Sequence, residues 1–329
     1  MTIPLLAGAG LHVIVQGMSL FAIIITLLIE QVKPLDERRY VLGPLARYAQ
    51  VFEHQFNDGQ NRHGMIAWLA AVLLPVVLML ILQGLLWFFQ PLLAGALSIG
   101  VLYLTLGFRH SSHFFTDIHR ALRDHDIGRA RQLLAEWRSR SGDRLTSNEV
   151  ARLAIEEALI ASHRHVFAPI FWFAILGPAG AVLYRLALFF NLQWGGRGLV
   201  EHDAEFGEFG RFARKAYAAI DWAPVRCSAA AFAIVGDFED AIYCWRSQAQ
   251  TWTADAYGIL LASGAGALGV RLGLPLHDDA GDLGDRPELG LGDDADADFL
   301  QSTIGLVWRT LLLFLFVLTL FWLGSLVGG

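Results

Sequence analysis

The sequence has very little cysteine and lacks the usual local signatures of nucleophilic catalysis and nucleotide hydrolysis. Its two cysteines, Cys227 and Cys244, form no CxxC pair, which excludes a disulfide framework and predicts two small apolar filler residues. No Walker sequence and no Ser/His/Asp or Cys/His arrangement occurs, so P-loop ATP use and nucleophilic catalysis have no local support. With a net charge of −6, nucleic acid is not an expected partner.

Apolar side chains dominate what is present. They make up 55% of the chain, and its mean hydropathy is +0.45, too apolar for an ordinary soluble domain. They gather in blocks of about 18 to 25 residues, the helix length that crosses about 30 Å of hydrocarbon. The sequence therefore predicts an all-α, polytopic helical membrane protein with four to five spans and the lipid bilayer as a partner.

Apolar blocks in four parts of the chain predict membrane helices. The first, within residues 1–31, lacks a basic n-region and a small-residue cleavage site, so we expect a retained span rather than a signal peptide. The turn at Gln90-Pro91 joins the two helices of a transmembrane hairpin at residues 65–108. A proline-containing span follows at residues 166–190, and the last span is expected at residues 304–326.

Arginine placement predicts the topology. Residues 109–165 form an arginine-rich segment with helical patterning, and such segments favour the cytoplasmic side. Counting spans back from it places residues 32–64 in the cytoplasm as well. In a bacterium this topology corresponds to a multi-pass protein of the inner membrane.

Proline and charge disturb the second half of the chain. Pro178 lies in the middle of the span at residues 166–190 and is expected to kink or break the helix there. Within the polar loop and helices expected at residues 191–273, Asp221 and Arg226 lie in an apolar stretch, which predicts an interfacial, re-entrant or bundle-interior helix with paired charges. Residues 274–303 are expected to form an acidic, solvated loop, or alternatively a cation-binding one.

Each of three short patterns can be interpreted either as a structural feature or as a functional site. Gly264 to Gly269 satisfies GxGxxG, but without a βαβ context a helix-packing face or an anion-binding nest is favoured over a dinucleotide site. His110, His113 and Asp117 share one helix face, either as a polar interfacial surface or as ligands of a divalent metal. His163-Arg164-His165 precedes a span and either anchors it or captures an anionic group.

Several of these stretches together resemble one protein family. The stretches that carry the resemblance are Val166 to Arg185, Asp221 to Arg226, Gly264 to Gly273 and Arg286 to Gly290. They are similar to the CobD/CbiB superfamily of inner-membrane proteins, and the likeness runs over most of the chain from about Met18 onward. The resemblance implies adenosylcobinamide-phosphate synthases, which join an aminopropanol unit or its phosphate to adenosylcobyric acid, with Mg²⁺ and ATP as cofactors if that activity holds. The AmpE proteins, linked to β-lactamase regulation, are its non-biosynthetic branch.

The sequence departs from the enzymes of this family at acidic positions. Where they have E-N-x-x-D-G before the span, this chain has Ile160, Ala161, Arg164 and His165. A later asparagine and aspartate become Leu188 and Asn191, and an aspartate pair becomes Tyr217 and Ala218. Since carboxylates suit Mg²⁺ and phosphate chemistry, these changes remove acids and invert the local charge.

The leading hypothesis is therefore an AmpE-like member that lacks the synthase acids, is non-enzymatic or has altered chemistry, and acts in envelope signalling or binds an anionic ligand at the cytoplasmic face. Its arginines would hold phosphate or carboxylate groups, and Asp221 would orient Arg226. A corrinoid, a nucleotide or another anionic small molecule is the expected ligand. The expected ligand-binding residues are His163, His165, Arg185, Asp221, Trp222, Arg226, Arg271 and Arg286.

Two alternatives remain open. The first is a cobalamin-biosynthesis amide ligase in which Glu156, Glu157 or the acidic loop replaces the missing carboxylates. The second is a structural membrane assembly partner with no small-molecule site.

Overall fold

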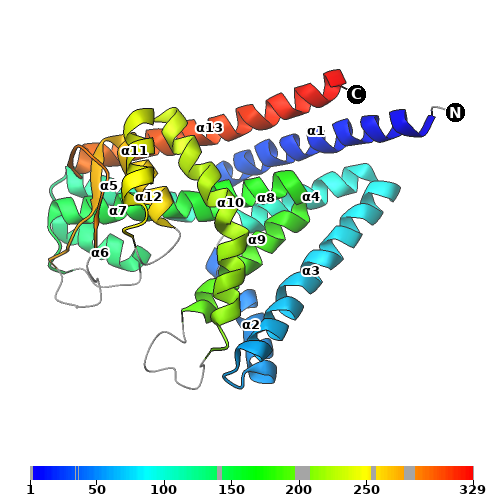
Figure 1. Ribbon diagram of the computed structural model, residues 1–329, viewed down its shortest axis with the longest axis horizontal. Coiled ribbons are helices and arrows are strands. Elements are labelled where there is room, and N and C mark those ends of the chain that lie inside the picture. The colour runs from blue at the N-terminus through cyan, green and yellow to red at the C-terminus, as the bar shows by residue number, and fades with distance from the viewer. Residues whose placement is uncertain are drawn as a thin grey trace. The chain divides into compact units, whose positions relative to one another are not determined.

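The chain forms two compact units. The computed structural model describes residues 3–33, 35, 37–138, 143–196, 208–252, 257–277 and 286–328. Unit 1 comprises residues 1–107, 168–222 and 317–329, and unit 2 comprises residues 108–167 and 223–316. Both units are almost entirely helical (Figure 1).

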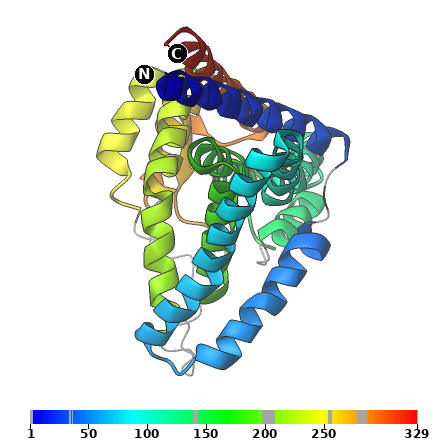
Figure 2. The same cartoon turned by 90° about the vertical axis from the view of Figure 1, so that its right-hand side faces the viewer.

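Unit 1 is built from apolar helices. Helices α2 and α3 form a hairpin, visible in both views (Figures 1 and 2). Its elements are α1 (Ile3–Val32), η1 (Arg38–Leu42), α2 (Gly43–Phe56), α3 (Asn61–Phe89), α4 (Pro91–Thr105), α8 (Ala168–Leu176), α9 (Pro178–Phe190), η3 (Asn191–Gly195), the start of α10 (Arg211–Val235) and the end of α13 (Ala297–Gly328).

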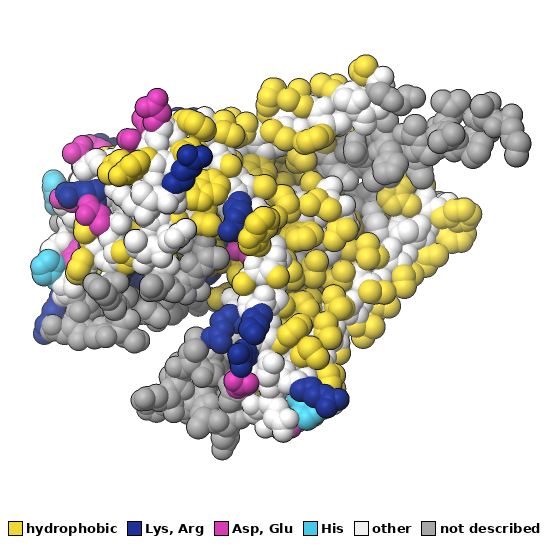
Figure 3. Space-filling model, in the orientation of Figure 1, with side chains coloured by type: hydrophobic (Ala, Val, Ile, Leu, Met, Phe, Trp, Pro, Cys, Tyr) yellow, Lys and Arg dark blue, Asp and Glu magenta, His cyan; other side chains and the backbone are white. Residues whose placement is uncertain are grey.

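Helix α3 places its small residues inside and its large apolar residues outside. Ala67 and Ala71 are fully buried, whereas Leu74 and Leu78 are more than half exposed. In water this arrangement would be unfavourable, but against lipid tails it is the expected one, because small residues let helices approach closely. Hydrophobic side chains accordingly cover a large part of the visible surface along α3 (Figure 3).

Four of the described helices are long and apolar enough to cross a membrane. They are Asn61–Phe89, Ser147–Leu176, Arg211–Val235 and Ala297–Val327. The predicted fold class, an all-α polytopic membrane protein, is confirmed. Such helices expose apolar side chains to lipid, so the bilayer is a partner of the chain.

The boundaries differ from the sequence prediction in two places. The predicted break at Pro178 is confirmed, because Gly177, with a φ of 62°, separates α8 from α9. Upstream, however, a continuous apolar helical run extends back to Ser147, into the segment predicted to be cytoplasmic. Helix α13 begins at Ala297, within residues 274–303, for which the sequence predicts an acidic loop.

Unit 2 combines helices with a small sheet. Strand β1 lies between β2, its antiparallel neighbour, and β3, its parallel neighbour. Its elements are α5 (Phe108–Arg123), α6 (Ile127–Arg138), α7 (Ser147–Ser162), η2 (His163–Phe167), the end of α10, α11 (Phe238–Gln248), α12 (Tyr257–Leu268), β1 (Val270–Gly273), β2 (Glu288–Leu289), β3 (Asp293–Asp294) and most of α13.

The GxGxxG pattern forms a helix-packing face, as predicted. It ends helix α12 instead of opening a helix after a strand, as a dinucleotide site requires. A Cβ atom on Gly266 would lie 2.5 Å from the main-chain oxygen of Asp240 in α11. Glycine is therefore what allows α11 and α12 to pack so closely.

Candidate functional site

Helix α7 begins with a capping box that fixes its first turn. The Thr146 hydroxyl accepts a hydrogen bond from the main-chain N–H of Glu149, and the Glu149 carboxylate accepts bonds from the main-chain N–H and the hydroxyl of Thr146. This reciprocal arrangement satisfies otherwise unpaired donors at the helix N-terminus. It also holds the Glu149 carboxylate in one orientation.

The other oxygen of Glu149 binds a segment far along the chain. It accepts hydrogen bonds from the main-chain N–H of His277 at 2.8 Å and from the imidazole Nδ1 of His277 at 2.9 Å. One turn further along α7, Arg152 donates to the main-chain oxygen of Pro275 at 3.3 Å. The first turns of α7 thus hold residues 275 to 277, which follow strand β1.

Glu156 holds the next part of the same region. Its carboxylate accepts bonds from Arg286 Nη2 at 2.5 and 2.6 Å, and from the main-chain N–H of Gly273 at 2.9 Å. The Arg286 guanidinium also lies over the Trp252 ring, 5.4 Å from its centre. Strand β1 and the residue that leads into β2 are therefore both attached to α7.

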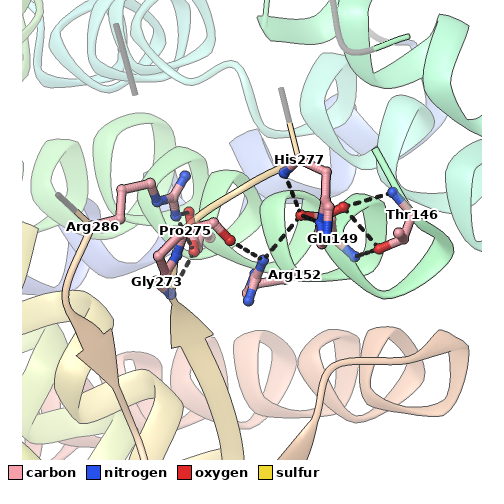
Figure 4. A network of polar contacts seen from close by, with 8 residues as sticks. Thr146, Glu149, Arg152, Gly273, Pro275, His277 and Arg286 are labelled. Carbon is pink, nitrogen blue, oxygen red and sulfur yellow. Dashed lines mark hydrogen bonds and ion pairs between the residues drawn. The ribbon is translucent and has the colours of Figure 1, made fainter. Parts of the chain in front are cut away.

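These contacts form one polar cluster, which we call the α7 network (Figure 4). Glu149, Arg152 and Glu156 share a face of α7, and each is less than 9% exposed. Burying charges is costly unless they are paired and hydrogen-bonded, and in this cluster carboxylates and guanidiniums alternate. The members of the network are Thr146, Glu149, Arg152, Glu156, Gly273, Pro275, His277 and Arg286.

Arg271 extends the charged region along the sheet. It donates from Nη2 to Asp294 at 2.8 Å, and its Nη1 lies 3.7 Å from Glu288. The parallel register sets Arg271 beside Asp294, which explains the first contact. Unlike the α7 carboxylates, all three of these side chains are more than one-third exposed.

The predicted site residues divide between the two units. His163, His165, Arg226, Arg271 and Arg286 belong to unit 2, whereas Arg185, Asp221 and Trp222 belong to unit 1. Arg286 is a member of the α7 network, and Arg271 lies in the same strand as Gly273, another member. His163 is fully buried and bonded through Nδ1 to the Ser228 hydroxyl at 2.9 Å, while His165 and Arg226 are partly exposed.

In unit 1 the predicted residues have other partners. Arg185 of α9 forms a buried ion pair with Glu37. Asp221 accepts a hydrogen bond at 3.1 Å from Tyr184, whose hydroxyl lies 3.0 Å from that of Tyr217, and Trp222 is 59% exposed. That Asp221 orients Arg226 stays a prediction.

Sequence reasoning missed Glu149, Arg152 and His277, and named Glu156 only as an alternative. Two signals pointed to them. Thr146-x-x-Glu149 has the capping-box spacing that precedes an apolar run. Glu149, Arg152 and Glu156 follow one another at i, i+3 and i+7, which places them on one helix face.

Two further predictions concern the histidine pattern at residues 110–117 and the two cysteines. No group of three or more His, Cys, Asp or Glu side chains among the described residues is placed to hold a metal ion, and the side chain of His110 lies outside them. Cys244 is buried in α11, which raises the pKa of its thiol to about 11. Cys244 is therefore a buried apolar filler, as predicted, whereas Cys227 is exposed.

Comparison with known proteins identifies one family and relatives that share one name. The family described as CobD/Cbib protein matches residues 19–307. The Cobalamin biosynthesis protein CobD of Stutzerimonas stutzeri is 36% identical over 261 residues, covering 78% of this chain and 83% of that protein. The protein of the same name from Chromobacterium violaceum is 36% identical over 183 residues, covering 56% of this chain and 57% of that protein. No solved structure matches the chain.

Proposed function

The chain belongs to the CobD/CbiB family, and from that premise we propose that it is an enzyme of cobalamin biosynthesis in the bacterial inner membrane. The proposed reaction joins an aminopropanol unit or its phosphate to a corrinoid carboxyl group through an amide bond, driven by ATP. The names of the relatives support cobalamin biosynthesis over the AmpE-like role expected from the sequence.

The α7 network is the observation that carries this proposal. A helix that served only for packing would be at least as stable with apolar residues at the positions of a buried ion pair. Here Arg152 and Glu156 are instead buried charges attached to a strand and to residues more than 115 positions away along the chain. Guanidinium groups bind phosphate and carboxylate groups through paired hydrogen bonds, so Arg152 and Arg286 suit a phosphorylated or carboxylate-bearing substrate.

The residues of the α7 network have a binding role in the proposed reaction. The chain's own contribution is to bind and orient anionic groups through arginine and main-chain N–H donors.

The AmpE-like, non-enzymatic role remains a second candidate because of one observation. Where the family enzymes have an aspartate, this chain has Arg164, which donates from Nε to the Tyr257 hydroxyl at 2.8 Å and lies over the Tyr257 ring. The position is thus occupied by a structural cation and not by a carboxylate.

Complementation distinguishes the two roles. The gene is supplied to a bacterial strain that lacks the synthase, and cobalamin-dependent growth is measured alongside the amount of protein in the membrane. We expect the wild-type chain to restore growth and Arg286→Lys to restore it poorly. Failure of a well-inserted wild-type protein would favour the non-enzymatic role. Arg211→Lys, in an exposed ion pair with Glu208, is the matched control.

A further inference from the structure

Three arginines around the α7 network have hydrogen-bond donors that are not in use. The Nε atoms of Arg152, Arg271 and Arg286 are buried and have no hydrogen-bond partner among the residues that the structure describes. A buried donor without a partner is destabilising, because it has lost its hydrogen bonds to water without gaining others. Such groups are rare in folded proteins and call for an explanation.

In the contact between Arg286 and Glu156, the Nε donor of Arg286 makes no hydrogen bond to any residue that the structure describes. Both oxygens of Glu156 are bonded to the same nitrogen, Nη2, while Nε is unused. A carboxylate or phosphate that used the full guanidinium edge would accept from two nitrogens in parallel, which is the stronger geometry. Glu156 therefore leaves part of the binding capacity of Arg286 unfilled.

Glu156 itself occupies a cradle suited to an anion. The carboxylate is held by a guanidinium on one side and by the main-chain N–H of Gly273 on the other. Main-chain N–H groups and arginines are also the donors that proteins use for phosphate. A second guanidinium, Arg152, is within electrostatic reach of both Glu156 and Arg286.

We propose that a phosphate group of the substrate replaces the Glu156 carboxylate in this cradle. The incoming phosphate accepts from Arg286 and from the Gly273 N–H, and so engages the edge of Arg286 that Glu156 leaves idle. Arg152 lies one turn before Glu156 on the same face of α7, so it provides a cation for the released carboxylate. Glu156 is then an internal competitor that keeps the neighbouring arginines neutralised until the substrate binds.

The inference rests on the proposed function for the identity of the ligand. Two phosphate sources fit that function: a phosphorylated amino alcohol, and the phosphates of a nucleotide. Both present a terminal phosphate with several acceptor oxygens, which is the chemistry that the cradle recognises.

Binding to the purified, detergent-solubilised protein tests the exchange. Calorimetric titration with O-phosphoethanolamine and with ADP distinguishes the two sources, and ethanolamine and adenosine are the controls without phosphate. We expect one phosphorylated probe to bind and its control not to bind. Arg286→Lys keeps the charge beside Glu156 but removes the forked set of N–H donors of the guanidinium, so the affinity for that probe should fall by about tenfold or more.

The competing role of Glu156 predicts a change of opposite sign. Glu156→Gln keeps the size of the side chain but removes the charge, so the phosphorylated probe should bind several-fold more tightly. Weaker binding in a Glu156→Gln protein with unchanged melting temperature would overturn the exchange. If that variant does not fold, the Arg286→Lys variant provides the test. The proposal would be overturned if Arg286→Lys bound the phosphorylated probe as tightly as the wild type and Arg211→Lys do.

The binding test of the phosphate cradle and the growth test of the proposed function can fail independently of each other. If the wild-type gene restores cobalamin-dependent growth but neither phosphorylated probe binds in a manner dependent on Arg286, the phosphate cradle is wrong and the function stands. If a probe binds as expected but growth is not restored, the proposed function is wrong and the cradle stands.

Discussion

The carboxylates inside the two units accept hydrogen bonds from different kinds of donor. In unit 1, Asp221 and Glu37 accept hydrogen bonds from the side chains of Tyr184 and Arg185. In unit 2, Glu149 and Glu156 accept bonds from side chains and also from main-chain N–H groups of distant segments, His277 and Gly273.

The difference has consequences for stability and for function. A carboxylate held by side chains loses its support when one partner is changed, whereas a carboxylate that also accepts main-chain bonds keeps part of it. The α7 network should therefore tolerate single substitutions better than the ion pair of unit 1. Such tolerance is what a site needs if one of its contacts is to be exchanged for a ligand.

The largest effect is expected from Arg185→Met in unit 1. The change leaves the Glu37 carboxylate, only 11% exposed, without its guanidinium partner. An unpaired buried charge costs about 3–5 kcal/mol. The midpoint of thermal unfolding in detergent measures the loss. In the double variant Glu37→Leu/Arg185→Met both charges are absent, and most of the stability should return; no recovery would show that the pair is not the cause.

Arg286→Met tests the same kind of change in unit 2 and is expected to cost less. Glu156 keeps the N–H of Gly273 and remains within reach of Arg152, so we expect a loss of about 1–3 kcal/mol. Thermal unfolding is again the measurement. A loss equal to that of Arg185→Met would break the comparison, because the main-chain bonds would then contribute nothing.

Sequence alone predicted the fold class and much of unit 1, for a clear physical reason. Apolar runs such as residues 65–89 have the length that a membrane helix requires, and a helix pairs all the backbone groups of such a run within the run itself. Pro178 predicted the break between α8 and α9 for a similarly local reason, since it lacks an N–H group.

The candidate site was predicted only in part, because its contacts join distant parts of the chain. Arg286 and Arg271 were named from the family resemblance, but nothing in their surroundings indicates that Glu156, 130 residues earlier, is the partner of Arg286. Asp221 and Arg185, which were predicted to share a site with them, belong to unit 1. Charge type is visible in a sequence, whereas pairing depends on the tertiary fold.

Thr146→Ala sharpens the comparison within the α7 network. The hydroxyl caps the helix and bonds to Glu149, and removing such a cap costs about 1 kcal/mol. Glu149 still accepts from the main-chain N–H groups of Thr146 and His277, so the effect should not exceed that of a simple cap. Chemical denaturation measures it, with Thr146→Ser as the control that keeps the hydroxyl; a loss as large as that of Arg286→Met would contradict the prediction.

The smallest effect is expected from His277→Ala, at the exposed end of the network. The imidazole bonds to Glu149, but it is 77% exposed, and exposed contacts of this kind contribute little, here under about 0.5 kcal/mol. The main-chain N–H of His277, which the substitution leaves in place, continues to bind the same oxygen. Glu149→Gln, which alters the acceptor of both bonds, should lower the unfolding midpoint more than His277→Ala does. If the two variants were equally destabilised, the imidazole and not the main chain would be holding residues 275 to 277 to α7, and the contrast between the units would lose its physical basis.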